Sequence, residues 1–305
     1  MIKAIVFDPR APRRFAFGEV PAPVPAAGDE LLIEVRAISL NSGEVSTGDN
    51  VVDPGDVPGW DSSGVVLTPA ADGTGPPAGT RVVGADWSRG WAQQRVLTAD
   101  NVAVLPESLD FETAAALSVA GVTAVQIVRR LGAVVGRRVL VTGASGGVGR
   151  LAVQLAARAG AHVVAAVGSP ERGVGLRDLG ADEVVVGLGG VAPVYGVLEH
   201  VGGTMLAEAF GLLEDGGRVI SVGAASGEPT TIDFEAERMT MVRKHIEPFM
   251  TSWPVGSDLR YVVELAGSGQ LSAQIGLRDS WRNLDAAIDA LLGRTVAGKV
   301  ALTVD

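Results

Sequence analysis

The sequence predicts an α/β fold in which a doubly wound parallel sheet is inserted into a β-rich domain. Short apolar runs separated by proline and glycine fill residues 1–113, and from residue 114 strand-like runs alternate with helical patterns. A glycine-rich turn at residues 142–149 joins one strand-like run to a helix. A chain of 305 residues accommodates two domains, which we place at 1–113 with 256–305, and at 114–255.

The first part of the chain predicts strands joined by turns. The apolar runs that indicate these strands are Ala4–Phe7, Leu31–Val35, Gly64–Leu67 and Arg81–Val83. Several prolines and glycines predict a loop between Thr68 and Gly79.

The middle of the chain predicts βαβ units, and the tail predicts one helix and one closing strand. Strands are expected at residues 138–141, 163–167, 183–186, 197–201, 218–222 and 299–304. Helices are expected at residues 149–159, 171–179, 205–213 and 284–292.

Composition and charge argue against several classes of function. A net charge of −10 and a pI near 4.9 do not suit a protein that binds a nucleic-acid backbone. The chain has no cysteine, which excludes disulfides, thiolate nucleophiles and cysteine-ligated zinc. The apolar region at 139–168 contains Arg150 and Arg158, so we expect no membrane span. The first residues do not resemble a signal peptide, and we therefore expect a cytoplasmic protein.

The glycine-rich turn is the most informative local feature. Its small residues let the main chain approach a pyrophosphate, and the helix that follows offers free N–H groups and the positive end of its dipole. Alanine stands where the first glycine of G-x-G-x-x-G is usual, and Gly146 and Gly149 hold the second and third places. The turn therefore predicts dinucleotide binding. Its candidate cofactor-binding residues are Ala144, Ser145, Gly146, Gly147, Val148 and Gly149.

The end of the second strand distinguishes NADPH from NADH. An NAD site normally has a carboxylate there that accepts a hydrogen bond from the ribose 2′-hydroxyl. This strand ends in Gly168 and Ser169 instead. Ser169 and Arg172 offer the donor and the positive charge that a 2′-phosphate needs. Glu171 is a competing carboxylate, although its place after Pro170 also suits a first helical turn. We favour NADPH.

Six motifs together resemble the medium-chain dehydrogenase/reductase superfamily, in its zinc-independent quinone oxidoreductase branch. They follow one another in the family's order and cover nearly the whole chain. The matching stretches are Ser39–Glu44 ("LNxxD"), Pro58–Val66 ("PGxDxxGxV"), Ala120–Ala124 ("xGxTA"), Ala144–Gly149 ("AxGGVG"), Gly216–Gly223 ("GGRxxxxG") and Gly298–Val300 ("GKVV").

The resemblance implies a Rossmann domain inserted in a GroES-like catalytic domain, a small-molecule substrate, and a homodimer. It makes Asn41 and Ser42 the catalytic candidates, while Glu44 is expected to organise the cleft and Asp61 to hold the N-terminal domain together. It also adds Thr123, Gly223, Ala224 and Phe249 to the cofactor-binding candidates.

The resemblance also predicts that the protein lacks zinc. Asn41, Trp60 and Val119 stand at the places of the Cys, His and Cys ligands of the zinc branch. Without a metal, alcohol oxidation is harder, whereas hydride transfer to a quinone or to the C=C of an α,β-unsaturated carbonyl needs only hydrogen-bond donors and a proton.

Some alternatives stay open at this point. Many relatives carry a substrate-facing tyrosine shortly after "LNxxD", but this chain has none there, so solvent is a candidate proton source. The protein is then either a general quinone or enone reductase, a dedicated enoyl or tailoring reductase, or a non-catalytic NADPH-binding sensor. The loop at 45–57 is expected to shape the pocket. The tryptophans at 60, 87 and 91 either line that pocket or pack a core.

Overall fold

A computed structural model describes residues 1–46 and 53–305, so residues 47–52 of the expected pocket loop lie outside the described part. The chain forms two compact units: residues 1–122 with 252–305, and residues 123–251. The sequence places the boundaries at 113/114 and 255/256. The first division differs because one long helix, α2 (Phe111–Leu131), runs through it.

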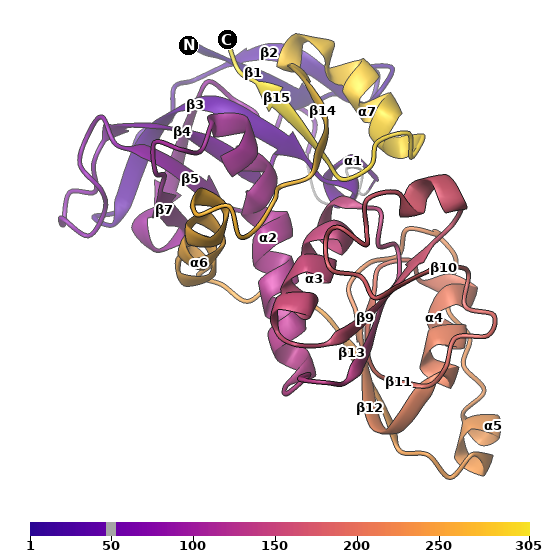
Figure 1. Ribbon diagram of the computed structural model, residues 1–305. Coiled ribbons are helices and arrows are strands. Elements are labelled where there is room, and N and C mark those ends of the chain that lie inside the picture. Colours follow the sequence, from indigo (N-terminus) through magenta and orange to yellow (C-terminus); the bar gives the residue numbers. More distant parts are fainter. Residues whose placement is uncertain (47–52) are drawn as a thin grey trace. The chain divides into compact units, whose positions relative to one another are not determined.

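The second unit is built on a six-stranded parallel sheet (Figure 1). Numbered along the chain, its strands follow the order 3-2-1-4-5-6, which is that of a dinucleotide-binding fold. The order reverses between β8 and β11, and the carboxyl ends of these two strands flank the switch point. The strands are β8 (Arg138–Val141), β9 (His162–Val167), β10 (Glu183–Val186), β11 (Val194–Glu199), β12 (Leu213–Ser221) and β13 (Lys244–Pro248).

Helices complete this unit. In α3 (Gly147–Arg158) the apolar residues share one face, and Leu151, Ala152 and Ala156 are fully buried. One core cluster joins the strands to α4 (Gly203–Gly211) through Leu140, Val197 and Phe210. Asp233 caps α5 (Phe234–Met239) by accepting from the N–H groups of two residues of its first turn.

The expected helix at 171–179 is wrong. The structure has a short 3₁₀ helix, η3 (Pro170–Gly173), followed by turns. Gly175 adopts φ +78° and Gly180 φ +103°, conformations that do not continue a right-handed helix. Periodicity alone did not reveal that glycines interrupt this segment.

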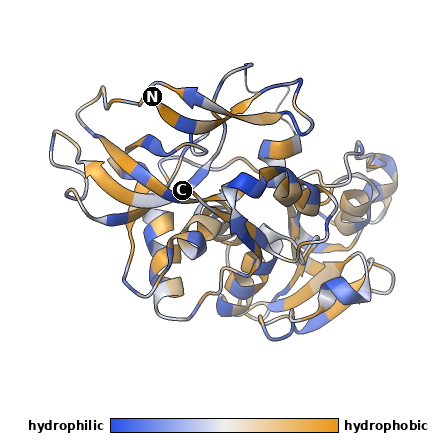
Figure 2. Ribbon diagram, turned by 90° about the horizontal axis from the view of Figure 1, so that it is seen from above, coloured by the Kyte–Doolittle hydropathy of each residue, from blue (hydrophilic) through white to orange (hydrophobic). Residues whose placement is uncertain are grey.

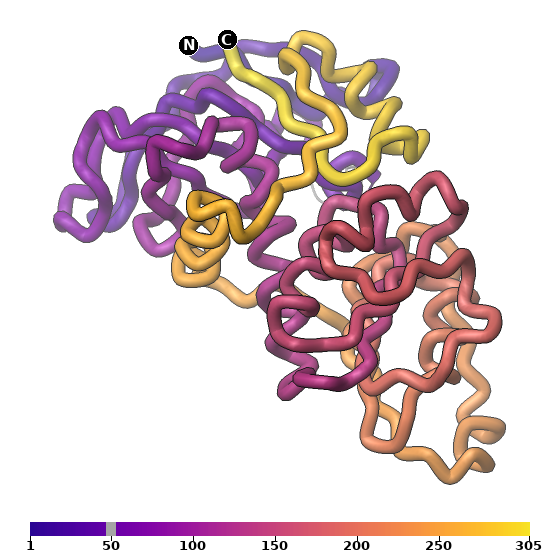
Figure 3. The backbone as a smooth tube through the Cα atoms, viewed as in Figure 1, coloured from indigo at the N-terminus to yellow at the C-terminus, as the bar shows by residue number. Residues whose placement is uncertain are grey.

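The first unit contains a seven-stranded sheet and a separate two-stranded one. The closing strand β15 (Lys299–Thr303) pairs antiparallel with β3 (Glu30–Leu40), so the yellow end of the chain lies beside an indigo segment (Figure 3). The other strands of the larger sheet are β4 (Asp61–Thr68), β5 (Arg81–Ala85), β6 (Gln94–Thr98), β7 (Val102–Val104) and β14 (Ile275–Ser280). The smaller sheet joins β1 (Ile2–Phe7) to β2 (Phe15–Val20).

Alternating burial explains most of these strands. In β3 the side chains of Leu31, Ile33 and Val35 are buried and alternate with less buried neighbours. Hydrophobic residues accordingly follow the strands and helices, whereas many connecting loops are hydrophilic (Figure 2). Trp91 is fully buried in this core beside Phe15, with ring centroids 5.2 Å apart, so it packs a core rather than a pocket.

Helices α1 (Ser42–Ser46), α6 (Gly256–Gly267) and α7 (Leu284–Leu292), with 3₁₀ turns η2 (Ala99–Asn101) and η4 (Trp281–Asn283), also belong to this unit. The sequence did not predict α6 or α2. Among the described residues α2 is the one helix long and apolar enough to cross a membrane, but 78% of its most apolar window is buried. That burial is typical of a core helix.

Candidate functional site

The glycine turn after β8 is shaped by close backbone contacts. Gly143 adopts φ +56°, and its carbonyl accepts a hydrogen bond from the N–H of Gly146 at 3.0 Å. A Cβ on Gly149 would lie 2.4 Å from the oxygen of Gly143, so only glycine lets the helix approach the turn this closely. The N-cap, Gly146, has no side chain to satisfy the first N–H groups of α3. The turn therefore presents free donors and open space, as an anion site requires.

Predicted residues after β9 lie against this turn. Nη1 of Arg172 lies 3.4 Å from Oγ of Ser145, which brings a guanidinium to the glycine turn. Arg150 braces the same region, since its Nη2 donates to the carbonyl of Val174 at 3.0 Å. The Ser169 hydroxyl, however, donates to Glu171 and lowers the pKa of that carboxyl. The segment after β9 thus carries both a cation, Arg172, and an ionised carboxylate, Glu171.

Gly223 and Ala224 meet the end of β11 rather than the glycine turn itself. The N–H of Gly223 donates to the carbonyl of Glu199, and a Cβ on Gly223 would lie 3.0 Å from the oxygen of His200. Ala224 packs on Gly202. These contacts put both residues at the same edge of the sheet as the switch point.

Thr123 and Phe249 lie outside the glycine turn and the segment after β9. Thr123 is buried within α2, and Phe249 follows β13, two strands beyond β11 in the sheet. No hydrogen bond among the described residues joins either to the glycine turn.

A buried polar network at the switch point was not predicted. Glu199 is fully buried and accepts from the Thr142 hydroxyl at 2.9 Å and from the N–H of Val201 at 2.9 Å. His200 bonds to the carbonyl of Thr142 through Nδ1 at 2.9 Å, and burial lowers its pKa to about 4. The imidazole is therefore neutral, and it ties the end of β11 to the glycine turn. The sequence signal was slight: two polar residues that directly follow an apolar run.

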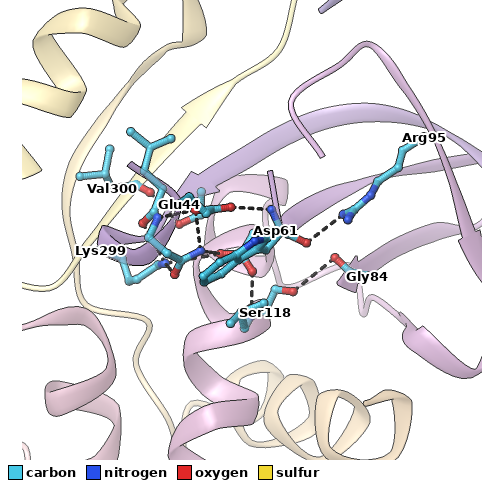
Figure 4. A network of polar contacts seen from close by, with 12 residues as sticks. Glu44, Asp61, Gly84, Arg95, Ser118, Lys299 and Val300 are labelled. Atoms are coloured by element: carbon cyan, nitrogen blue, oxygen red, sulfur yellow. Dashed lines mark hydrogen bonds and ion pairs between the residues drawn. The ribbon is translucent and has the colours of Figure 1, made fainter. Parts of the chain in front are cut away.

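The first unit holds a buried polar network that includes Glu44, Asp61 and Lys299 (Figure 4). Asn41 donates both amide hydrogens to carboxylates, to Oδ2 of Asp61 at 2.7 Å and to Oε2 of Glu44 at 2.9 Å. Its Oδ1 accepts from the Lys299 ammonium at 2.6 Å. The Asn41 amide thus has no hydrogen left for a substrate, and it acts as the centre of this network.

Asp61 and Lys299 complete the network from distant strands. Asp61 is fully buried and also accepts from the N–H of Val119 at 2.7 Å. Lys299 lies 3.4 Å from Asp61 and donates to the carbonyl of Leu40. Burial, together with the charge of Asp61, raises the pKa of Glu44 to about 8. The motif residues Asn41, Glu44 and Asp61 therefore meet, and Lys299 of the closing motif joins them.

Ser42, unlike Asn41, lies outside the buried polar network. It begins α1 and is exposed, and its carbonyl accepts from the Ser46 hydroxyl at 2.6 Å. No hydrogen bond of the Ser42 hydroxyl is present among the described residues, so this hydroxyl remains available as a donor. Trp60 packs on the residue that follows Ser42, because a Cβ on Gly43 would lie 2.7 Å from the Trp60 ring.

The side chains at the zinc-ligand places do not fit a zinc ion. Asn41 is engaged with two carboxylates and an ammonium, Trp60 has no suitable donor atom, and Val119 is aliphatic. In the described part of the chain, no three His, Asp or Glu residues are grouped so that they could hold a metal.

Comparisons with known proteins agree with this architecture. Residues 147–268 match the family described as zinc-binding dehydrogenase. The acrylyl-CoA reductase of Ruegeria pomeroyi is 36% identical over 196 residues, which cover 58% of this chain and 59% of that protein. The chain thus matches little more than half the length of this relative.

Two solved structures align over nearly the whole chain. The quinone oxidoreductase of Coxiella burnetii is 26% identical with a TM-score of 0.85, covering 100% of this chain and 99% of that one. The Escherichia coli quinone oxidoreductase, solved with NADPH, is 21% identical with a TM-score of 0.86, covering 99% and 100%. The predicted fold class is confirmed. Its motifs, strand order and relatives show that the chain belongs to the medium-chain dehydrogenase/reductase superfamily, in its quinone oxidoreductase-like branch.

Proposed function

We propose that the protein is an NADPH-dependent oxidoreductase that transfers a hydride, without a metal, to a quinone or to the C=C of an α,β-unsaturated carbonyl. The observation that carries the proposal is the uncapped glycine turn at the switch point of the parallel sheet, with Arg172 beside it.

The residues of the glycine turn suit the pyrophosphate of NADPH, and those of the segment after β9 suit its 2′-phosphate. The pyrophosphate would be bound by the N–H groups of Gly147 and Val148 at the start of α3, because Gly146 has no side chain to block its approach and Gly149 lets α3 pack closely on the turn. Arg172 would bind the 2′-phosphate. When bound, NADPH supplies the hydride that reduces the acceptor.

The first unit would supply the hydrogen bond that the acceptor needs. As hydride reaches an electron-poor carbon, negative charge collects on the carbonyl oxygen, and a positioned donor stabilises it. We assign this role to the Ser42 hydroxyl, since both amide hydrogens of Asn41 are engaged. Asn41 would position Ser42 through the Lys299 network. Solvent would provide the proton, so that hydride plus proton reduce the acceptor by two electrons.

The names of the relatives support both acceptor classes. One relative reduces acrylyl-CoA, whose C=C is conjugated to a carbonyl, and two solved structures are quinone oxidoreductases. Residues 1–46 and 53–305 hold no group of ligands that fits zinc, which supports reduction without zinc, although the matched family is described as zinc-binding.

Glu171 is the observation that favours NADH instead. An ionised carboxylate at the end of the second strand is the usual partner of a ribose 2′-hydroxyl. Relative affinity for the two cofactors therefore tests the phosphate-binding role of Arg172.

We further propose a cytoplasmic homodimer that acts on small molecules. Strand β13 is an edge strand, and Met241, Ile246 and Met250 on and around it are exposed. Pairing with a second copy would satisfy this edge and cover these side chains. Light scattering on the purified protein measures its mass directly.

The central experiment is cofactor titration followed by turnover. NADPH and NADH are titrated by fluorescence, and NADPH oxidation is then recorded with 1,4-benzoquinone, 9,10-phenanthrenequinone and several 2-enones. Tighter binding of NADPH and turnover of an acceptor are expected. Turnover of one enone alone would identify a dedicated enoyl reductase, whereas tight NADPH binding without any turnover would contradict the enzyme and favour a sensor.

A further inference from the structure

The tryptophans of this chain fall into two groups. Trp91 and Trp281 are almost completely buried in the core. The other three meet in the first unit and are only partly buried: the Trp60 and Trp87 rings lie 5.4 Å apart edge to face, and the Trp87 and Trp253 rings also lie 5.4 Å apart. Trp87 is 44% exposed. The exposed Trp87 ring does not stand alone, since it contacts two further indoles, and aromatic rings gathered in this way offer a surface for a ligand ring.

This group, which we call the tryptophan wall, begins against Gly43, the residue that follows Ser42 in α1. The Trp60 ring fills the space that a side chain at residue 43 would need. Trp87 and then Trp253 extend the aromatic surface away from that point. The row of indoles thus begins one residue along α1 from the Ser42 hydroxyl, within the same unit.

A buried arginine fixes the wall. Arg95 is 1% exposed, and its guanidinium donates to the carbonyls of Trp60 at 2.9 Å, Asp86 at 3.0 Å and Ser88 at 2.7 Å. The last two carbonyls stand on either side of Trp87. Because one rigid, planar group holds both segments, the Trp60 and Trp87 backbones keep a fixed spacing without any substrate.

A fixed aromatic surface beside one hydrogen-bond donor suits a flat, uncharged, electron-poor ring system. Indoles are electron-rich, and offset or edge-to-face contacts between aromatic rings add to the area that they bury. A quinone fused to further rings offers both features: its carbonyl accepts from a hydroxyl, and its rings reach along the wall. A small acyclic enone has no ring to place there.

We infer that the tryptophan wall, braced by Arg95, selects polycyclic quinones as the preferred acceptors. This inference rests on the proposed function and narrows its substrate class. Trp87 is the specificity residue, Ser42 the donor to the quinone oxygen, and Arg95 a positioning residue.

The test compares two acceptors on matched variants. The ratio of kcat/KM for 9,10-phenanthrenequinone to that for 2-cyclohexen-1-one is measured with NADPH for the wild type, Trp87→Leu and Trp87→Phe. We expect Trp87→Leu to lower this ratio about tenfold, and Trp87→Phe to restore much of it. Phe17→Leu is the control, since Phe17 is 49% exposed but contacts Trp281. It should leave the ratio unchanged.

A binding measurement without cofactor separates this inference from the proposed function. Phenanthrenequinone is titrated into each protein by calorimetry, and Trp87→Leu should weaken its binding about tenfold. If the wild type oxidises NADPH with neither acceptor, the proposed function fails. If it turns over both acceptors but Trp87→Leu changes neither the ratio nor the affinity, the wall is structural and only this inference is overturned.

Arg95 is tested through the same ratio. Arg95→Lys keeps a cation but loses the planar fork that reaches both segments, so the ratio should fall while NADPH affinity is kept. An unchanged ratio in a folded Arg95→Lys protein contradicts the bracing role. Thermal unfolding shows whether the variant is folded.

Discussion

The Lys299 ammonium lies 2.6 Å from Oδ1 of Asn41, although 258 positions separate the two residues in the chain. This contact joins the closing strand to the start of α1, and it brings the only ammonium of the described network to 3.4 Å from the buried Asp61 carboxylate. Substitutions in this network should therefore change both the free energy of unfolding and the position of the candidate catalytic residues Asn41 and Ser42.

Replacing Lys299 with methionine should be strongly destabilising. Asp61 would keep a fully buried carboxylate without its cation, which costs on the order of 3–5 kcal/mol of unfolding free energy. Urea unfolding near neutral pH measures the change. The double variant Asp61→Asn/Lys299→Met should lose less than Lys299→Met alone, and equal losses would contradict a direct pairing.

Stability should fall as pH rises, because of Glu44. Its pKa is about 8 in the folded protein against an ordinary value of 4.5, so between these values the folded state binds more protons than the unfolded state. Glu44 therefore stabilises fully below pH 4.5 and loses this contribution as pH rises toward 8. Unfolding free energies of the wild type and Glu44→Gln, measured between about pH 5 and 8, should diverge by a few kcal/mol. Parallel curves would show that Glu44 is ionised throughout.

Two glycines of the turn should respond differently to alanine. In Gly149→Ala the new Cβ meets the backbone of Gly143 and Ala144, so we expect a loss of about 1–3 kcal/mol of stability and weak NADPH binding. In Gly146→Ala the nearest atom is 3.4 Å away and φ is −78°, so folding should be kept while NADPH affinity falls. Thermal unfolding and fluorescence titration distinguish the two effects. Normal NADPH affinity in Gly146→Ala would argue that no pyrophosphate approaches this turn.

Arg172→Ala should weaken NADPH binding about 10- to 100-fold, because a hydrogen-bonded pair with the 2′-phosphate is lost. NADH binding should hardly change. Arg177→Ala is the matched control, since Arg177 is exposed nearby and donates to the carbonyl of Asp182. An equal loss for NADPH and NADH would assign Arg172 to the structure of the turn through Ser145 rather than to the phosphate.

Ser42→Ala should lower kcat about 10- to 100-fold for every acceptor, because one donor to the developing oxyanion is removed. NADPH affinity and thermal stability should stay close to those of the wild type. Ser46→Ala removes a hydroxyl that bonds only to the Ser42 carbonyl among the described contacts, and serves as the control. A normal kcat in Ser42→Ala would require another donor.

Local patterns predicted much of the fold. The alternating run at 31–35 and the buried runs at 138–141 and 163–167 were found because their side chains face a core directly. Helix α2 was missed because it is apolar on most of its surface, so no polar face marks its period. The segment at 171–179 was mistaken for a helix because glycine conformations, not hydrophobic spacing, decide its path.

The candidate site was predicted where it is local and missed where it is not. The glycine turn and Arg172 follow two consecutive strands that pair in parallel, so both lie at one edge of the sheet. By contrast, the pairing of Asn41 with Lys299 and the meeting of Trp60, Trp87 and Trp253 depend on strand register and on long-range packing. No periodicity within a window can show such contacts.

The pairing of β15 with β3 sets an order for biosynthesis. Residues 123–251 form a unit of their own and leave the ribosome before the last strand is made. The other unit cannot close its sheet until residues 299–303 arrive. During that interval Asp61 has no lysine to meet, so the arrival of Lys299 both completes the sheet and supplies the cation beside the buried Asp61 carboxylate in a single event.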